Sequence, residues 1–130
     1  MAEYHAPVND FRFALHQVLD IDAQLQSLPD CDEFTPDLID AVLEEAARLS
    51  NTVLAPLNKV GDEAECHLDP DSGAVTSPPG FADAYTSWVE GGWGGLNAPP
   101  EYGGQGLPEV VGAAVKEMVD AANLAWGTYP

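Results

Sequence analysis

Hydrophobic residues along the chain recur mostly at spacings of three and four, which is the period of an α-helix. The longest such run starts after Thr35, which can serve as an N-cap, with Pro36 at the first helical position. Pro56 removes one backbone N–H, so the pattern predicts a kink or a restart there, and Gly61 is predicted to end the helix. The apolar stripe of this run is Leu38, Val42, Ala46, Leu49, Val53, Leu57 and Val60.

Shorter elements are predicted on both sides of this helix. Residues 10–19 form an amphipathic helix with Asp10 as its N-cap, and residues 81–90 form another that ends at Gly91. The turn-rich segment between residues 62 and 80 permits a small β-hairpin. We therefore expect an all-α fold, a bundle of about four helices with a small β-hairpin excursion.

The last predicted helix opens with Pro108 in its first turn and is apolar on most of its surface. Its narrow polar stripe should face solvent, and the other sides should be buried. Glu117 lies one step off that stripe, so a buried Glu117 would be either a structural carboxylate or a general base with a raised pKa. The stripe consists of Glu109, Gly112, Lys116, Asp120 and Asn123.

The amino-acid composition and net charge exclude some classes of function. With 130 residues, of which 45% are hydrophobic, the chain has the size and the apolar content of one folded domain. Its 22 acidic and 4 basic residues give a net charge of −18. Nucleic-acid binding is therefore excluded as a working hypothesis, because that affinity depends on Lys and Arg at the phosphates. The small number of Lys and Arg residues also disfavours this chain as the main binding site for a phosphorylated cofactor.

Neither a signal peptide nor an apolar run long enough to span a membrane is seen, so we expect a cytoplasmic protein without a membrane span. Cys31 and Cys66 are isolated and are predicted to stay unpaired. The three histidines are also far apart, and no metal-ligand or catalytic motif is present. The sequence thus predicts no metal site and no catalytic residue.

Glycine and proline are concentrated between residues 91 and 107. The spacing does not match GxGxxG or a phosphate-binding loop, so a nucleotide cradle is disfavoured. So many glycines and prolines between two helices indicate a backbone of specific shape that another group approaches closely.

Several short motifs follow one another along the chain. They are Tyr4-x-Ala6-Pro7 with Arg12-Phe13, Leu54-Ala55-Pro56-Leu57-Asn58 with Gly61-Asp62, Pro79-Gly80-Phe81, Gly92-Trp93, Tyr102-Gly103-Gly104-Gln105-Gly106-Leu107-Pro108, and Glu117-Met118 with Ala122-Asn123. Taken in this order, they resemble the N-terminal helical domain of one subgroup of the acyl-CoA dehydrogenases. On this resemblance residues 1–33 are an N-terminal extension with a short helix, and residues 34–130 are the helical domain.

The resemblance implies part of an FAD enzyme that oxidises acyl-CoA thioesters, including fatty and sulfur-containing ones, at the α and β carbons. In such enzymes other domains hold FAD and most members' catalytic Glu, so this chain alone is expected to bind no FAD and to supply no catalytic base. Its expected partners are the remaining flavin-binding domains or a second subunit, and the acyl-CoA. The residues implied to form one wall of the substrate and flavin site are Tyr102, Gly103, Gly104, Gln105, Gly106 and Met118.

A second hypothesis needs no flavin. The chain could be an acidic helical module that binds another protein, or a non-catalytic subunit. It would then associate with further copies of itself through surfaces at Trp88, Trp93 and Trp126. Whether the chain is part of an enzyme is left open between these two hypotheses.

Overall fold

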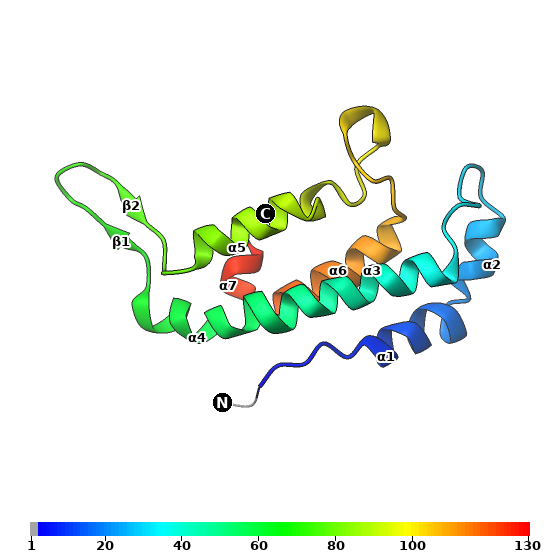
Figure 1. The fold of residues 1–130 in the computed structure, drawn as a ribbon, viewed down its shortest axis with the longest axis horizontal. Helices are drawn as coiled ribbons and strands as arrows, with labels where there is room; N and C mark the ends of the chain where they lie inside the picture. The colour runs from blue at the N-terminus through cyan, green and yellow to red at the C-terminus, as the bar shows by residue number, and fades with distance from the viewer. Residues whose placement is uncertain (1–2) are drawn as a thin grey trace.

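The computed structural model describes residues 3–130 and is mostly helical (Figure 1), so the predicted fold class is confirmed. The predicted hairpin is present as a two-stranded antiparallel sheet in which Leu68 pairs with Val75. Within the described part, no helix is long and apolar enough to cross a membrane. The main elements are α1 (Val8–Arg12), α2 (Ile21–Gln26), α3 (Pro36–Leu49), α4 (Ala55–Ala64), β1 (His67–Leu68), β2 (Val75–Thr76), α5 (Phe81–Glu90), α6 (Glu109–Ala122) and α7 (Leu124–Gly127).

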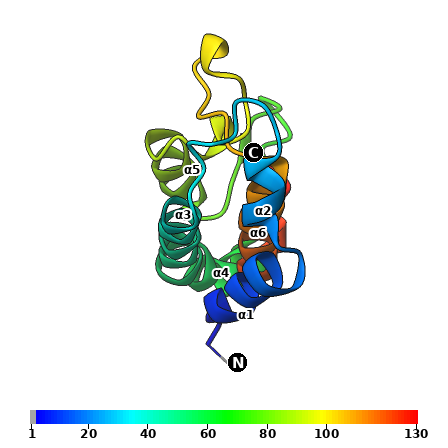
Figure 2. The same ribbon diagram turned by 90° about the vertical axis from the view of Figure 1, so that its right-hand side faces the viewer.

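Helices α3 and α6 form the centre of the molecule, with α4 continuing the line of α3 (Figure 1). Figure 2, turned by 90°, shows α3 and α5 on one side and α2 and α6 on the other. The core between them is made of fully buried aliphatic side chains. These are Ile39, Leu43 and Leu54 from the α3 side and Val111, Met118 and Val119 from α6.

The N-terminal segment packs on this same core. Leu15, Ile21 and Leu25 are buried, and Tyr4 donates a hydrogen bond from its hydroxyl to the Met118 carbonyl at 3.2 Å. The backbone N–H of Ala6 donates to the Asn51 side chain at 2.8 Å. Residues 3–26 are thus attached to the helices by both apolar and polar contacts.

The start of α3 is as predicted, but the start of α1 is not. Thr35 has an extended backbone and its hydroxyl accepts a hydrogen bond from the Leu38 N–H at 3.3 Å. Asp10 was predicted to cap the first helix, whereas the helix begins two residues earlier, directly after Pro7 and without a side-chain cap. Pro7 itself occupies the N-cap position, and its carbonyl accepts hydrogen bonds from the N–H groups of Asp10 at 3.0 Å and Phe11 at 3.2 Å.

The buried stripe of α3 coincides with the predicted one in part. Ala46 and Leu49 are buried as predicted, whereas Leu38 is 42% exposed. Ile39 and Leu43, each one residue beyond a predicted position, are completely buried and were missed. Val42 is partly buried and borders a groove toward α5 and the following loop.

The expected interruption at Pro56 is confirmed, and it is larger than one residue. A π-helical segment, Ser50–Leu54, separates α3 from α4, which restarts at Ala55. The prediction that Gly61 ends the helix is wrong, because α4 continues to Ala64. Gly61 instead makes room for Phe81: a Cβ at Gly61 would lie 2.8 Å from the Phe81 ring.

Helix α6 is buried along one side only. Its inward residues form the core, whereas Ala113, Glu117 and Ala121 are exposed. Glu117 therefore does not have the buried environment that would make it a general base. It lies near Tyr4, and burial, with the Glu117 charge as a smaller cause, raises the pKa of the Tyr4 hydroxyl.

Asn123 was assigned to the polar stripe of α6, but only 1% of it is exposed. Its side-chain N–H donates to the Leu54 carbonyl at 3.2 Å, and its Oδ1 accepts from the Trp126 N–H at 3.1 Å. The first bond connects the end of α6 to the π-helical segment, and the second starts α7. Asn123 is thus a buried polar link and not a surface residue.

We expect Asn123→Ala to lower the free energy of unfolding by about 1–3 kcal/mol, because two buried backbone groups lose their partner. Urea denaturation followed by circular dichroism measures this loss. Asn58→Ala is the matched control, since Asn58 is exposed on α4. Equal stabilities of the two variants would contradict this role of Asn123.

Candidate functional site: a glycine-rich wall loop and an apolar face

Residues 96–107 form a projecting loop, here called the wall loop, drawn in yellow above α6 in Figure 1. Its two ends meet, because the Leu107 N–H donates to the Leu96 carbonyl at 3.0 Å and both side chains are buried. Further in, the Gly106 N–H donates to the Ala98 carbonyl at 3.0 Å. These bonds give the loop a defined shape rather than leaving it an open connection.

The Asn97 side chain joins the base of the wall loop to the residues that lead into α6. Asn97 donates from Nδ2 to the carbonyls of Leu107 at 2.8 Å and Pro108 at 2.9 Å. A Cβ on Gly112 would overlap the Asn97 amide, so the glycine in α6 provides the space that Asn97 occupies. The position of the loop relative to α6 therefore depends on a side chain to backbone contact that this small residue permits.

The glycines of the wall loop have two separate functions in its shape. Gly103 and Gly106 have φ of 83° and 68°, a region that residues with a Cβ rarely adopt. Gly104 has an ordinary φ, but a Cβ there would overlap the Ala98 carbonyl oxygen. The sequence indicated a specific backbone shape here, and the structure has one.

The structure brings five of the six predicted wall residues together. Tyr102, at the tip of the loop, is 81% exposed, and Gln105 is exposed while its Nε2 donates to the Gly92 carbonyl at 3.1 Å. Gly103, Gly104 and Gly106 form the backbone between and beside them. Met118 lies apart from this group, on the inward side of α6, where it is fully buried in the hydrophobic core. It supports the fold from within and has no surface of its own.

An apolar surface adjoins the wall loop along the outer side of α5. We call it the α5 face and define it by the exposed residues Tyr85, Val89 and Tyr129. Tyr85 and Val89 are 49% and 57% exposed. Tyr85 borders a cavity of about 580 Å³ together with Phe81 and Tyr129. Tyr85 and Val89 also border a second hollow of about 490 Å³, which reaches Gly103 of the wall loop. The face and the loop thus form one continuous surface.

The sequence analysis missed the α5 face as a site. The helical period places Phe81, Ala84, Tyr85 and Trp88 on one face of α5, and the structure buries all of them except Tyr85. Periodicity gave no signal for the exposed part, because the four-residue spacing of Tyr85 and Val89 is also that of a buried stripe. At the end of the face, contact with the Cys66 thiol raises the pKa of the Tyr129 hydroxyl.

A smaller groove of about 400 Å³ lies between the wall loop and α3. Its lining includes Val42, Leu49, Trp93 and Gln105. Arg48, also in the lining, forms an ion pair with Glu45 at 2.6 Å.

The tryptophans proposed as contact surfaces between copies are mostly inside the protein. Trp126 is 1% and Trp88 is 7% exposed, and their rings meet edge to face with centroids 5.6 Å apart. The Trp126 indole N–H donates to the Phe81 carbonyl at 3.2 Å. Trp88 and Trp126 therefore stabilise the core beneath the α5 face and do not offer the exposed contact surface that the alternative hypothesis requires of them.

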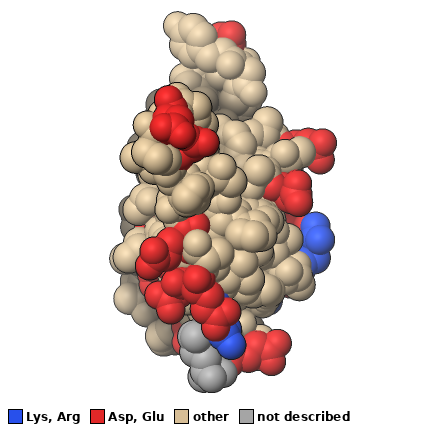
Figure 3. All heavy atoms as spheres, turned by 90° about the vertical axis from the view of Figure 1, so that its left-hand side faces the viewer, with Lys and Arg blue, Asp and Glu red and all other residues tan. Residues whose placement is uncertain are grey.

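The charges do not fit a phosphate group. Each of the four basic side chains lies within 4 Å of a carboxylate of this chain. Figure 3 shows acidic side chains widely spread over one face of the molecule and few basic ones. The first turn of α6 carries Glu109, which repels anions. Residues 3–130 also contain no group of three or more His, Cys, Asp or Glu placed to hold a metal ion.

We expect Gly104→Ala to disrupt the wall loop, because the new methyl group overlaps the Ala98 carbonyl. Overpacking of this kind costs about 1–3 kcal/mol. Hydrogen exchange of the amides of residues 96–107 should accelerate, while exchange in α6 stays slow. Gly95→Ala is the matched control, since its Cβ would make only ordinary contacts at 3.5 Å. If both variants retain slow exchange, the close approach at Gly104 does not determine the loop.

No family model matches the chain. Two curated relatives are similar to it over nearly its whole length. The 3-methylmercaptopropionyl-CoA dehydrogenase of Ruegeria pomeroyi is 39% identical over 127 residues, 98% of this chain. The butyryl-CoA dehydrogenase of Syntrophomonas wolfei is 31% identical over 121 residues, 92% of this chain.

The chain spans about a fifth of the length of each relative, 21% and 20% respectively. The matched part is the N-terminal region, and in this chain it folds into helices with a small hairpin. Nearly the whole chain is therefore homologous to the N-terminal fifth of the acyl-CoA dehydrogenases, the part that forms their N-terminal helical domain.

Proposed function

We propose that the chain forms one wall of the acyl-CoA and flavin site of an FAD-dependent acyl-CoA dehydrogenase, and that it is not catalytic alone. The observation that carries this proposal is the continuous surface of the wall loop and the α5 face. It combines a rigid glycine-rich backbone with exposed apolar side chains, which are the features of a surface that an apolar group approaches closely.

The chemistry of this surface matches the acyl end of a thioester. Tyr85, Val89 and Tyr102 expose apolar area that water solvates poorly, and each methylene group of an acyl chain gains about 0.8 kcal/mol on leaving water. The wall residues Gly103, Gly104, Gln105 and Gly106 lie at the edge of the same surface. Their contribution in this proposal is shape and the exclusion of water, since none of them is a base. Met118 belongs to the wall only as its buried support.

The phosphates of FAD and coenzyme A must be held by other parts of the enzyme. The basic residues of this chain are paired with its own carboxylates, and the start of α6 is acidic, so nothing here fits a diphosphate. The base that removes the α-proton also lies elsewhere, because Glu117 is exposed and outside the wall. The partners in this proposal are therefore the flavin-binding domains or a subunit that carries them.

Both relatives are named for acyl-CoA thioester substrates, one with a sulfur-containing and one with a simple four-carbon acyl group. We propose a substrate of this class for the enzyme to which this chain contributes. A thioether and a methylene chain are both apolar, so an aromatic and aliphatic wall accepts either.

A chimera tests the wall directly. This chain should replace the matching region of the Ruegeria pomeroyi relative and give a flavin-containing enzyme that oxidises 3-methylmercaptopropionyl-CoA. In that chimera Val89→Ser and Tyr102→Ser should each lower kcat/KM by about tenfold, equivalent to ~1.4 kcal/mol of lost contact. Steady-state assays with a dye as electron acceptor measure the change.

Val75→Ser is the matched control, because Val75 is exposed to a similar degree but lies on the hairpin away from the wall. Its kcat/KM should equal that of the unsubstituted chimera. Equal activity of all three variants in a folded chimera would show that the wall loop and the α5 face do not border the substrate.

The chain by itself should not oxidise acyl-CoA. When it is mixed with free FAD, butyryl-CoA and a dye acceptor, we expect neither dye reduction nor retention of flavin after gel filtration, because its cations are already paired. Turnover by the purified chain would contradict the proposal that the catalytic groups lie elsewhere.

A further inference from the structure

The N-terminal segment, residues 3–26, carries an exposed apolar surface of its own. Phe13, Val18 and Leu19 are 62%, 63% and 48% exposed, and we call these three residues the N-terminal patch. Figure 2 shows α1, which leads into the patch, at the bottom and the wall loop at the top, so the two surfaces lie at opposite ends of this view. Single exposed apolar residues are ordinary, whereas a group of them marks an interaction surface.

The backbone of the segment brings these side chains to one side. Phe13–Val18 form a π-helical turn, and the Leu19 N–H donates to the Ala14 carbonyl, five residues earlier, at 2.9 Å. At 3.6 residues per turn, residues five apart would point about 140° away from each other. The wider turn of i→i+5 bonding reduces this angle, so Phe13 and Val18 come to the same side of the segment.

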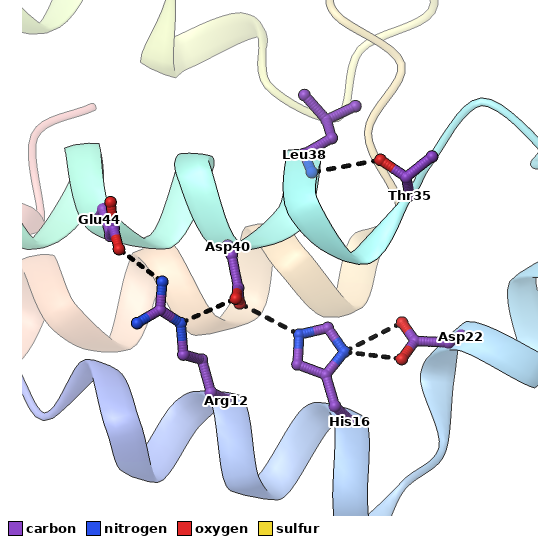
Figure 4. A network of polar contacts seen from close by, with 7 residues as sticks. All are labelled: Arg12, His16, Asp22, Thr35, Leu38, Asp40 and Glu44. Carbon is purple, nitrogen blue, oxygen red and sulfur yellow. Dashed lines mark hydrogen bonds and ion pairs between the residues drawn. The ribbon is translucent and has the colours of Figure 1, made fainter.

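The inner side of the segment is fixed to α3 by ion pairs. Arg12 Nε lies 3.0 Å from Asp40, and Arg12 Nη2 lies 2.5 Å from Glu44 (Figure 4). His16 lies between Asp22 and Asp40, at 2.9 Å and 3.2 Å. These contacts hold the segment in one orientation, so the N-terminal patch stays exposed and cannot turn toward the core.

The charges beside the N-terminal patch are negative. Asp10 lies three residues before Phe13, on the same side of the helix, and Asp20 directly follows Leu19; both are exposed. Arg12, the basic residue nearest to them in the chain, is already engaged by the carboxylates of α3. The patch is thus an apolar centre bordered by free carboxylates.

This charge decides between the possible occupants of the patch. A second copy of the chain would bring the same carboxylates against these ones, and each copy carries a net charge of −18. Like charges brought together in an interface cost several kcal/mol, and an anionic lipid surface is repelled for the same reason. A protein surface with an apolar centre and a border of Lys and Arg gains both from apolar burial and from charge complementarity.

The match to the Ruegeria pomeroyi relative indicates where such a surface would come from. It covers 98% of this chain, so it includes the N-terminal segment, but only 21% of the relative. In an enzyme of that length, the flavin-bearing part is about four times as large as this chain. It therefore has surface enough to contact more of this chain than the wall loop and the α5 face.

We propose that the N-terminal patch docks against an apolar, Lys- and Arg-bordered surface of the flavin-bearing part of the enzyme. This inference rests on the proposed function, since it takes the chain as part of such an enzyme, but it concerns a different surface from the wall. Phe13, Val18 and Leu19 supply the apolar contact, and Asp10 and Asp20 pair with the basic border.

Hydroxyl-radical footprinting of the chimera described above tests the occupant, because these radicals modify side chains that solvent reaches. Oxidation of Phe13 and Leu19 should fall severalfold from the isolated chain to the chimera, whereas Leu68, exposed on the hairpin, should be oxidised equally in both. Equal oxidation of Phe13 in the two proteins overturns the proposal. So does protection of Phe13 in the isolated chain that rises with its concentration, because the occupant is then a second copy.

The two proposals fail separately in this chimera. Exposed Phe13 together with a lowered kcat/KM of the Val89→Ser variant would refute the docking surface and leave the wall intact. Protected Phe13 together with an unchanged kcat/KM of that variant would support the docking surface and contradict the wall.

Two substitutions at Val18 test the charge of the occupant, and since Val18 is exposed both variants should fold. In the chimera, Val18→Lys should restore oxidation of Phe13 to nearly the level of the isolated chain, because a basic border repels the new cation. Val18→Glu should restore it less. Val75→Lys, with the same net charge as Val18→Lys but on the hairpin, should leave Phe13 protected. Equal effects of Val18→Lys and Val18→Glu, or the reverse order, would overturn the basic border.

Discussion

The contact between α3 and α6 is the constraint on which the other elements depend. Ile39 and Leu43 on one helix and Val111, Met118 and Val119 on the other are almost completely removed from water. Each such side chain contributes about 1.5–3 kcal/mol by burial, more than any surface ion pair of this chain can supply. The N-terminal segment, the wall loop and α7 all attach to this pair of helices, so their positions follow from it.

Basic side chains are rare in this protein, and they form ion pairs within the chain. There are 4 Lys and Arg residues against 22 Asp and Glu residues, and Arg12 and Lys116, for example, each pair with a carboxylate of the same chain. Lys116 illustrates this, since it binds Asp120 and also donates to the Gly127 carbonyl at 3.1 Å, which joins α6 to α7. Exposed apolar side chains remain on several elements, and those on α5 and the wall loop, Tyr85, Val89 and Tyr102, adjoin one another along one surface.

The sequence predicted most elements correctly because their causes are local. The Thr35 cap, the interruption at Pro56 and the hairpin depend on residues that are close in the chain. The errors concern long-range contacts. Gly61 looks like a helix end until Phe81 is seen against it, and Asn123 looks like a surface residue until its bond to Leu54 is known.

In the candidate site too, the sequence predicted the feature with a local cause and missed the one that depends on long-range packing. The glycines of the wall loop indicated a specific backbone, and Gly103, Gly104 and Gly106 do determine its shape. The α5 face could not be separated from core by periodicity, because a helix buried on two sides and a helix with one exposed apolar stripe have the same pattern. Exposure of Tyr85 distinguishes them, and exposure depends on which helices pack nearby.

Rigidity and apolar exposure coincide in this protein for a physical reason. An exposed apolar side chain on a mobile segment would collapse onto the nearest core, as hydrophobic contact favours. Tyr85 and Val89 stay outward because α5 is fixed from below by Trp88 and Trp126, whose rings are packed together and buried. Tyr102 stays outward because its loop is closed at the base by hydrogen bonds. The fold thus maintains an apolar surface that is ready for a partner without first having to be ordered.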